Sequence, residues 1–341
     1  MAENALSIYL TDDSIQLIDT IVSNNQIEIL DVVSQGNLPT YLSVLTDKAT
    51  GDVSKVIEKL LTGMKTKKRN VSVIIPDSIS YAQIVEMPKL KEKELLSAIR
   101  YQADQFIPMP IEKTTLDIEI LYENVALKTL LVLIVAAPED LVKKVEKLIE
   151  LSGLVPDSIE NELSASSRAL TQFYHPTVKT GGSLFVNLGY NSSSLYFFDH
   201  ALGLITDNHT FGLGLSLFLK EIEANLNIDT QKAKELLKIY GMPNAPVSLD
   251  TILEPVVIDL GREIEKFMIG ARERRASSAI QSIQFFNQID HIPGLAKKMA
   301  GHASVPLSVF TLEPYIKKTP LLQSYSSHLS SFTCAIGGTL R

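Results

Sequence analysis

Apolar and polar residues alternate most regularly in two short segments, Leu6–Asp19 and Leu184–Phe197, and in each the alternation passes through a polar turn. This pattern is typical of a β-hairpin that buries one face. Three pairs of positions correspond when the segments are superposed: Tyr9 with Asn187, Thr11 with Gly189, and Ser14 with Ser192. Because each hairpin opens about half of the chain, the two predict a duplicated fold of two lobes.

The remaining pattern mixes helices and strands along the whole chain. Apolar residues at helical spacing predict helices over residues 53–64, 92–106, 138–151, 163–173, 215–227, 230–240, 248–280, 295–301 and 324–335. Alternating or short apolar runs predict strands within residues 5–35 and over 71–75, 81–87, 116–121, 130–137 and 305–310. Since both element types occur in both halves, the sequence predicts an α/β fold rather than a helical bundle or a β-sandwich.

The segment Tyr174–Gly182 (YHPTVKTGG) is the predicted boundary between the lobes, because it combines a proline, paired glycines and polar residues. The first lobe is therefore expected over residues 1–176 and the second over residues 177–341. A chain of 341 residues is long enough for two lobes with separate cores.

The composition is that of a globular protein, with 45% hydrophobic and 21% charged residues. The formal net charge of -7 argues against a nucleic-acid-binding surface, which is usually basic. The longest apolar run, Leu130–Ala137, is far too short to cross a bilayer and predicts a buried strand. We therefore expect no direct membrane insertion, so any membrane location would depend on a partner.

Few residues suggest chemistry by their pattern alone. Cys334 is the only cysteine, which excludes an internal disulfide and a thiolate zinc site and fits a reducing cytoplasm. The 6 histidines show no HExxH-like spacing, so no metal ligands are expected. Asp12 and Asp13 interrupt the first apolar stretch, so no signal peptide is predicted. No catalytic residue is predicted.

A series of short motifs is spread along the chain. The motifs in the middle of the chain are Met87-Pro88, Glu94-Leu95, Ala98-Ile99, Gln105-Phe106-Ile107-Pro108-Met109-Pro110 and Leu116-Asp117. Further motifs are Ala136-Ala137-Pro138, Gly153-Leu154, Arg168-Ala169, Pro293-Gly294-Leu295 and Ala335-Ile336-Gly337. Together these motifs resemble PilM, the actin-like family of type IV pilus assembly, and the resemblance covers nearly the whole chain in order.

The resemblance implies an actin-like (ribonuclease H-like) duplicated two-lobed fold. A small inserted α+β subdomain is implied in the first lobe, here at about residues 77–160. A cytoplasmic scaffold is also implied, because in this family the protein binds a short N-terminal cytoplasmic peptide of the inner-membrane protein PilN. That peptide lies in a groove beside the inserted subdomain, and bound ATP is common in the family.

The first hairpin departs from the nucleotide-binding pattern that the resemblance implies. The family has an aspartate and a glycine where this chain has Tyr9 and Thr11. The following residues, Asp12 and Asp13, would face a phosphate with like charge, and each such pair costs roughly 1–4 kcal/mol. Thr11 would also narrow a backbone that must approach phosphate closely.

The other nucleotide segments depart as well. The second hairpin has Asn187 in place of an aspartate, and asparagine supplies no charge to hold Mg²⁺. A glutamate expected near the ribose is Lys234, and the glycines expected under the base are Asn287 and Gln288. The predicted degenerate cleft comprises Tyr9, Thr11, Asp12, Asp13, Ser14, Asn187, Gly189, Ser192, Lys234, Asn287 and Gln288. We expect it to hold no cofactor, with ATP and Mg²⁺ bound only if the family activity is retained.

The predicted helix over residues 92–106 offers the candidate partner surface. Its apolar stripe is expected to face the core. A tyrosine and an arginine lie off the stripe, and these residue types often anchor peptides. With the proline turn that follows, the predicted partner-binding residues are Arg100, Tyr101, Asp104, Gln105, Phe106, Ile107 and Pro108. The alternative is an ordinary solvated helix face.

The leading functional interpretation is a non-catalytic scaffold, a pseudo-ATPase of a type IV pilus or related secretion or DNA-uptake platform. It would be cytoplasmic and peripheral at the inner membrane face through a PilN-like partner. The alternative is an active actin-like ATPase of the same machinery. A third is a filament-forming division protein of the same superfamily, which is disfavoured because residues up to Arg341 show no C-terminal amphipathic helix. Homo-oligomers are compatible with each.

Overall fold

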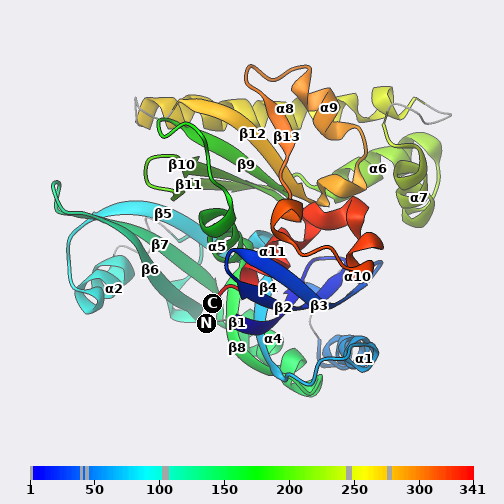
Figure 1. Cartoon of the computed structure of the whole chain (residues 1–341), viewed down its shortest axis with the longest axis horizontal. Helices are drawn as coiled ribbons and strands as arrows, with labels where there is room; N and C mark the ends of the chain where they lie inside the picture. Colours follow the sequence, from blue (N-terminus) through cyan, green and yellow to red (C-terminus); the bar gives the residue numbers. More distant parts are fainter. Residues whose placement is uncertain (1–2, 39–40, 43–45, 102–106, 243–247, 275–278) are drawn as a thin grey trace.

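The computed structural model describes residues 3–38, 41–42, 46–101, 107–242, 248–274 and 279–341. Their strands form two five-stranded sheets, in the orders β3-β2-β1-β4-β8 and β11-β10-β9-β12-β13, and one three-stranded sheet in the order β5-β7-β6. Each five-stranded sheet belongs to one lobe, and the lobes lie one above the other in Figure 1. The chain is thus α/β with two lobes, as predicted.

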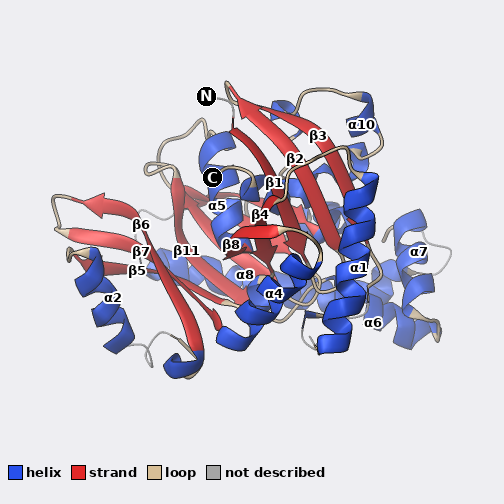
Figure 2. Ribbon diagram, turned by 90° about the horizontal axis from the view of Figure 1, so that it is seen from below, coloured by secondary structure: helices blue, strands red, loops and turns tan. Residues whose placement is uncertain are grey.

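The first lobe places helices against one face of its sheet. Its elements are β1 (Glu3–Leu10), β2 (Ile15–Ser23), β3 (Gln26–Gln35), α1 (Asp47–Gly63), β4 (Asn70–Ile75), α4 (Glu139–Leu151) and β8 (Val155–Asn161). Helices α1 and α4 lie side by side over the sheet (Figure 2). Ile57 of α1 and Val145 of α4 are fully buried there with Ile8 and Val73 of the strands. This burial of one helical stripe holds the layer together.

The second lobe repeats this architecture. Its elements are β9 (Gly182–Leu188), β10 (Ser193–Asp199), β11 (Leu204–Phe211), α6 (Leu215–Leu226), α7 (Thr230–Tyr240), α8 (Leu249–Arg274), β12 (Ile280–Asn287), α9 (Leu295–Ala300) and β13 (Leu307–Val309). The long helix α8 runs along the side of the sheet that faces away from the first lobe (Figure 1). Phe218 of α6 and Leu260 of α8 are buried with Phe285 of β12.

The two predicted hairpins have the same register. In the first, Tyr9 pairs with Gln16, and in the second, Asn187 pairs with Ser194. The turns also match, since Thr11 N–H donates to Ser14 O and Gly189 N–H donates to Ser192 O, both at 2.9 Å. The duplicated hairpin is therefore confirmed at the level of single hydrogen bonds.

A small subdomain is inserted between β4 and α4. It contains β5 (Tyr81–Pro88), α2 (Glu92–Tyr101), β6 (Thr114–Asn124) and β7 (Thr129–Pro138), with the short 3-10 turns η2 (Asp77–Ile79) and η3 (Ile111–Lys113). Helix α2 lies on the outer side of the three-stranded sheet (Figure 2). On the inner side, Asn208 of β11 accepts from Ile84 N–H at 3.0 Å and donates to Ala82 O at 2.8 Å. One amide side chain thus fastens the subdomain to the second lobe.

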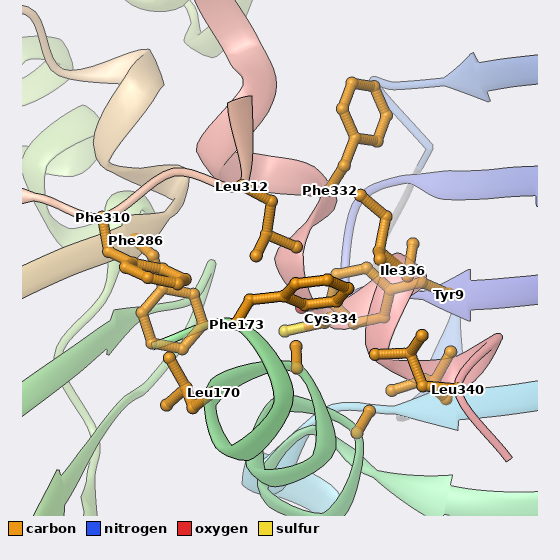
Figure 3. Close-up of a cluster of buried hydrophobic side chains, with 14 of the residues drawn as sticks. Tyr9, Leu170, Phe173, Phe286, Phe310, Leu312, Phe332, Cys334, Ile336 and Leu340 are labelled. Atoms are coloured by element: carbon orange, nitrogen blue, oxygen red, sulfur yellow. The ribbon is translucent and has the colours of Figure 1, made fainter. Parts of the chain in front are cut away.

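A buried core joins the lobes around α5 (Glu162–Phe173) and α11 (Thr333–Gly338), as Figure 3 shows. Phe173 and Ile336 meet Phe286 of the second lobe in one apolar cluster. At Gly337 an added Cβ would lie 2.0 Å from Ala165 O, so only glycine permits this approach of α11 to α5. The C-terminal segment therefore packs on the first lobe, although it follows the second in sequence.

Two helix predictions were wrong in their extent. The helix predicted over residues 248–280 ends as α8 at Arg274, and Ile280 already begins strand β12. The helix predicted over residues 324–335 is instead the 3-10 segment η6 (Ser326–Phe332), with non-helical angles at His328, followed by α11. Serine side chains explain this second error, because Ser331 Oγ donates to His328 O at 2.6 Å and competes with a regular helix.

The remaining short elements follow the second sheet. They are η4 (Gln288–His291), η5 (Glu313–Tyr315) and α10 (Pro320–Gln323). Ile316, just after η5, forms a parallel bridge with Ile27 of β3, and Lys317 N–H donates to Ile27 O at 2.8 Å. These contacts lead the chain back onto the first lobe before α11.

Candidate functional site

The turns of the two hairpins meet where the lobes face each other. Asp12, at the tip of the first turn, is only 4% exposed. Burial raises the pKa of Asp12, whereas the polar groups of Asn191, in the second turn, and of Ser78 oppose that shift. This acidic side chain therefore lies close to both turns.

Beside it, Asp13 forms an ion pair with a lysine of the other lobe. Lys234 Nζ of α7 lies 2.9 Å from Asp13 Oδ2 and 2.9 Å from Asn37 Oδ1. The same ammonium group lies 5.3 Å from the ring centroid of Tyr190, within cation–π range. Lys234 is therefore already held by an acid, an amide and an aromatic ring.

Deeper in the cleft, three predicted positions form one hydrogen-bonded chain. Asn287 Nδ2 donates to the Tyr9 hydroxyl at 2.9 Å and to Asn187 Oδ1 at 2.9 Å. Asn187 Nδ2 in turn donates to the Tyr196 hydroxyl at 3.2 Å. Tyr9, Asn187 and Asn287 are at most 1% exposed. These side chains are hydrogen-bonded to one another, so no space for a ligand remains between them.

Two buried acids lie beneath this chain of side chains. Asp77 Oδ2 accepts from Ser194 Oγ at 2.7 Å and from the Tyr196 hydroxyl at 2.6 Å. The Tyr9 hydroxyl donates to Glu162, which also accepts from Asp77 N–H at 3.0 Å. Burial and the neighbouring Asp77 raise the pKa of Glu162 to about 8. Asp77 therefore ties the first lobe to β10 of the second, and Glu162 holds Asp77 and Tyr9 within the first lobe.

The other predicted cleft residues shape the turns or line a cavity. Thr11 Oγ1 accepts from Ser14 N–H at 2.9 Å and so stabilises the first turn. Gly189 and Ser192 close the second turn through their backbone. A cavity of about 520 Å³ beside the ion pair is lined by Asp13, Ser14, Gln16, Asn37, Leu215, Leu219, Lys234, Lys238, Gln288, His291 and His328, among others.

This cavity carries few uncompensated charges. His291 and His328 stack with ring centroids 5.3 Å apart. Burial, and then the neighbouring His328, lower the pKa of His291 to about 4, so its ring is neutral at pH 7. Lys234 is neutralised by Asp13. Lys238 is a second cation on these walls, and Glu235 is an acid there, so a highly charged triphosphate would meet one lysine outside the Asp13 ion pair.

The structure describes only part of the predicted partner surface. Tyr101 is 92% exposed at the end of α2, and Arg100 beside it is exposed. Asp104, Gln105 and Phe106 lie outside the described residues. In the turn that follows, Pro108 is exposed, whereas Ile107 is only 3% exposed and packs into the core of the inserted subdomain, so its side chain supports the turn from within.

A groove lies next to this turn, between the inserted subdomain and α4. It has a volume of about 380 Å³ and is lined by Met109, Pro110, Lys113, Thr114, Pro138, Glu139 and Asp140. Its lining therefore combines one cation, two acids and several apolar residues. The sequence had indicated the turn but not the contribution of α4.

In the described part of the chain, no group of three or more histidine, cysteine, aspartate or glutamate side chains is arranged to hold a metal ion. None of the helices in that part is both long and apolar enough to span a bilayer.

Comparison with known proteins identifies the family. The family model described as type IV pilus assembly protein PilM matches residues 10–341. The chain belongs to this family. A chain of a solved PilM-PilN type IV pilus biogenesis complex superposes on it with a TM-score of 0.83 at 20% identity, covering 99% of this chain and 98% of that one.

More distant structures show the same fold as this PilM-family chain. EutJ, an ethanolamine utilization protein from Carboxydothermus hydrogenoformans, has a TM-score of 0.58 at 10% identity, covering 99% of this chain and 89% of that one. MreB 5 of Spiroplasma citri, bound to AMPPNP, has a TM-score of 0.51 at 11% identity, covering 99% and 95%. The predicted actin-like fold is thus confirmed.

Sequence reasoning missed the two buried acids of this PilM-family cleft. Asp77 follows β4 and Glu162 follows β8, and these strands are parallel neighbours. Residues at the carboxyl ends of neighbouring parallel strands meet at one edge of a sheet. The position of both acids at strand ends was therefore a usable signal in the sequence. Using it required a prediction of strand β8, and the sequence pattern had not predicted that strand.

Proposed function

We propose that this PilM-family chain is a non-catalytic cytoplasmic scaffold of a type IV pilus or related inner-membrane assembly platform. The observation that supports this most strongly is the closure of the cleft by the chain's own side chains. Asp13 holds Lys234, and Tyr9 and Asn187 share Asn287. Each of these groups would have to be displaced before a nucleotide could enter between the turns.

The residues present do not fit ATP with Mg²⁺. A magnesium site in such a cleft is usually built on carboxylates, but the deep position of the second hairpin is Asn187, which is already bonded on both sides of its amide. Asp12 and Asp13 would place two negative charges beside the phosphates. We therefore assign no step of hydrolysis to this cleft.

The partner we propose is the N-terminal cytoplasmic peptide of a PilN-like inner-membrane protein. The solved complex that superposes on this chain contains PilM and PilN. The groove between the inserted subdomain and α4 begins at Met109 and Pro110, directly after Pro108, and it combines these residues with Lys113. Such a mixture of apolar floor and charged rim suits a short peptide. The scaffold would thereby lie at the membrane face through its partner.

Peptide binding tests the proposed scaffold function of this chain. The N-terminal cytoplasmic peptide of the PilN-like protein should bind the full chain in a fluorescence anisotropy titration. Tyr101→Ala should weaken this binding by about tenfold or more, because exposed tyrosines often act as anchors. Tyr240→Ala is the matched control, since Tyr240 is 41% exposed on α7 of the other lobe. No binding, or equal loss in both variants, would count against this docking site.

Nucleotide binding separates the scaffold from the alternative, an active ATPase. We expect millimolar Mg-ATP to leave the thermal unfolding midpoint of the chain unchanged. A functional site would stabilise the fold by about 2.7 kcal/mol at a ligand concentration 100 times Kd. A Mg-ATP-dependent rise in the midpoint, measured by differential scanning fluorimetry against Mg²⁺ alone, would favour the ATPase.

A further inference from the structure

We infer that copies of this chain associate head to tail, with the end of the β6–β7 hairpin of one copy seated in an apolar groove on α8 of the next. The inference goes beyond the proposed peptide docking, because the partner is a second copy of the chain. The α8 groove shares no residue with the peptide groove or with the cavity between the lobes.

The turn that joins β6 to β7 projects from the outer end of the inserted subdomain, as Figure 1 and Figure 2 both show. It exposes two aliphatic side chains, since Val125 is 76% and Leu127 is 67% exposed. Hydrogen bonds fix the turn: Leu127 N–H donates to Asn124 Oδ1 at 3.1 Å, and Lys89 N–H donates to Lys128 O at 2.9 Å. Because the turn is already ordered, it can bury its apolar side chains in a partner at a small entropic cost.

The groove lies along α8, where this helix meets α9 and β13. It has a volume of about 380 Å³, and its apolar lining includes Ile258, Met268, Ile269, Met299 and Leu307. Ile258 and Ile269 are 43% and 50% exposed. Because they are about three helical turns apart, both lie on the same side of α8. An apolar hollow beside two exposed isoleucines is typical of a surface that contacts another protein.

The charges beside the two surfaces are complementary. The hairpin end carries two acids and one lysine, Glu119, Glu123 and Lys128. The groove carries two arginines and one acid, Arg262, Arg272 and Glu265. Glu123 is paired with Lys89, and Arg262 with Asp259, within the chain.

Each surface therefore keeps one acid and one base that form no ion pair with another described residue. The acid of one surface can meet the base of the other in both directions, which favours this pairing and its register. The same match assigns the groove to a second copy of the chain rather than to an apolar partner of another kind.

The contact joins two different surfaces, so it is heterologous. Each copy in a pair keeps one unused hairpin end and one unused groove. The number of joined copies should therefore grow with protein concentration instead of stopping at a dimer.

Sedimentation velocity of the full chain over roughly 1–200 μM tests the inference. The average mass of wild type should rise above that of one chain as the concentration increases. The double variant Val125→Asp, Leu127→Asp should associate about tenfold more weakly or less, and so should Ile269→Asp, because an unpaired charge would be buried in an apolar contact. Ile239→Asp is the matched control and should behave as wild type, since Ile239 is 70% exposed on α7, outside both surfaces.

A mixture of the two kinds of variant tests the pairing itself. The hairpin variant keeps its groove, and Ile269→Asp keeps its hairpin, so together they should form one-to-one complexes that grow no further. Each replaced side chain is at least half exposed, so thermal unfolding midpoints should stay near that of wild type. A wild-type chain that stays monomeric, growth that ends at a dimer, or a mixture without complexes would overturn the inference.

Peptide binding distinguishes this inference from the proposed function. The peptide groove lies at Thr114, the opposite end of β6 from the turn, so the hairpin variant should bind the PilN-like peptide as wild type does. If the chain does not associate but the peptide binds, the head-to-tail contact fails and the scaffold stands. If the chain associates as described but the peptide does not bind, only the peptide docking fails.

Discussion

Replacing Asp77 with alanine is expected to lower the free energy of unfolding by about 2–4 kcal/mol. The carboxylate accepts from Ser194 Oγ at 2.7 Å, from the Tyr196 hydroxyl at 2.6 Å and from Leu163 N–H at 3.2 Å. All these donors are buried, and each loses its acceptor in the variant. Relief of the repulsion between Asp77 and Glu162 returns part of the loss. Urea denaturation followed by circular dichroism measures the difference.

Asp52→Ala is the control for this substitution. The Asp52 side chain is 64% exposed on α1 and lies 4.0 Å from Lys55, so its loss should change stability by about 0.5 kcal/mol or less. Asp77→Asn keeps the shape and one acceptor oxygen and should fall between the two. If Asp77→Ala were as stable as Asp52→Ala, the acid would not be a link between the lobes.

The hairpins were predictable from sequence because their information is local. Alternation and a polar turn lie within a few residues, and the register followed from them. Strands β8 and β11 were missed because they carry polar residues along an edge of each sheet, and β8 also contains Pro156. Edge strands tolerate such residues, so their pattern does not stand out from a loop.

The closed state of the cleft could be predicted only in part. The substitutions at Tyr9, Asn187 and Asn287 were visible one by one, but not that the three side chains bond to one another. Their donors and acceptors are 100 and 278 residues apart. Likewise, the like charge of Asp12 and Asp13 was recognised as hostile to phosphate, whereas Lys234, which pairs with Asp13, comes from the other lobe. Such pairings depend on the tertiary fold.

Stability of the wild-type chain is expected to fall as pH rises from about 5 to 8, because of Glu162. Burial and then the Asp77 charge raise its pKa from 4.5 to about 8 in the folded state. Between these values the folded chain holds a proton that the unfolded chain has released. Folding therefore becomes less favourable with rising pH, by at most about 1.4 kcal/mol per pH unit for one such group.

Glu162→Gln should remove the Glu162 part of this slope, because glutamine resembles the protonated carboxyl group and does not titrate. Its carbonyl can still accept from Asp77 N–H, and its amide can face the Tyr9 hydroxyl. The variant should therefore be as stable as wild type near pH 5 and more stable near pH 8. Urea denaturation at several pH values measures both slopes, with Glu58→Gln, an exposed residue on α1, as the control.

The other titratable groups around Glu162 decide how complete the effect is. Asp77 of η2, Asp12 of the first turn, Tyr9 of β1 and Cys334 of α11 all interact with its charge. Burial also raises the pKa of Asp77, so part of the slope persists in the variant. Because burial raises the pKa of Tyr9 and Cys334 as well, these two groups stay neutral below pH 8 and add no slope. Parallel slopes for wild type and Glu162→Gln would show that Glu162 is ionised between the lobes throughout this range, and that the acids repel each other rather than share a proton.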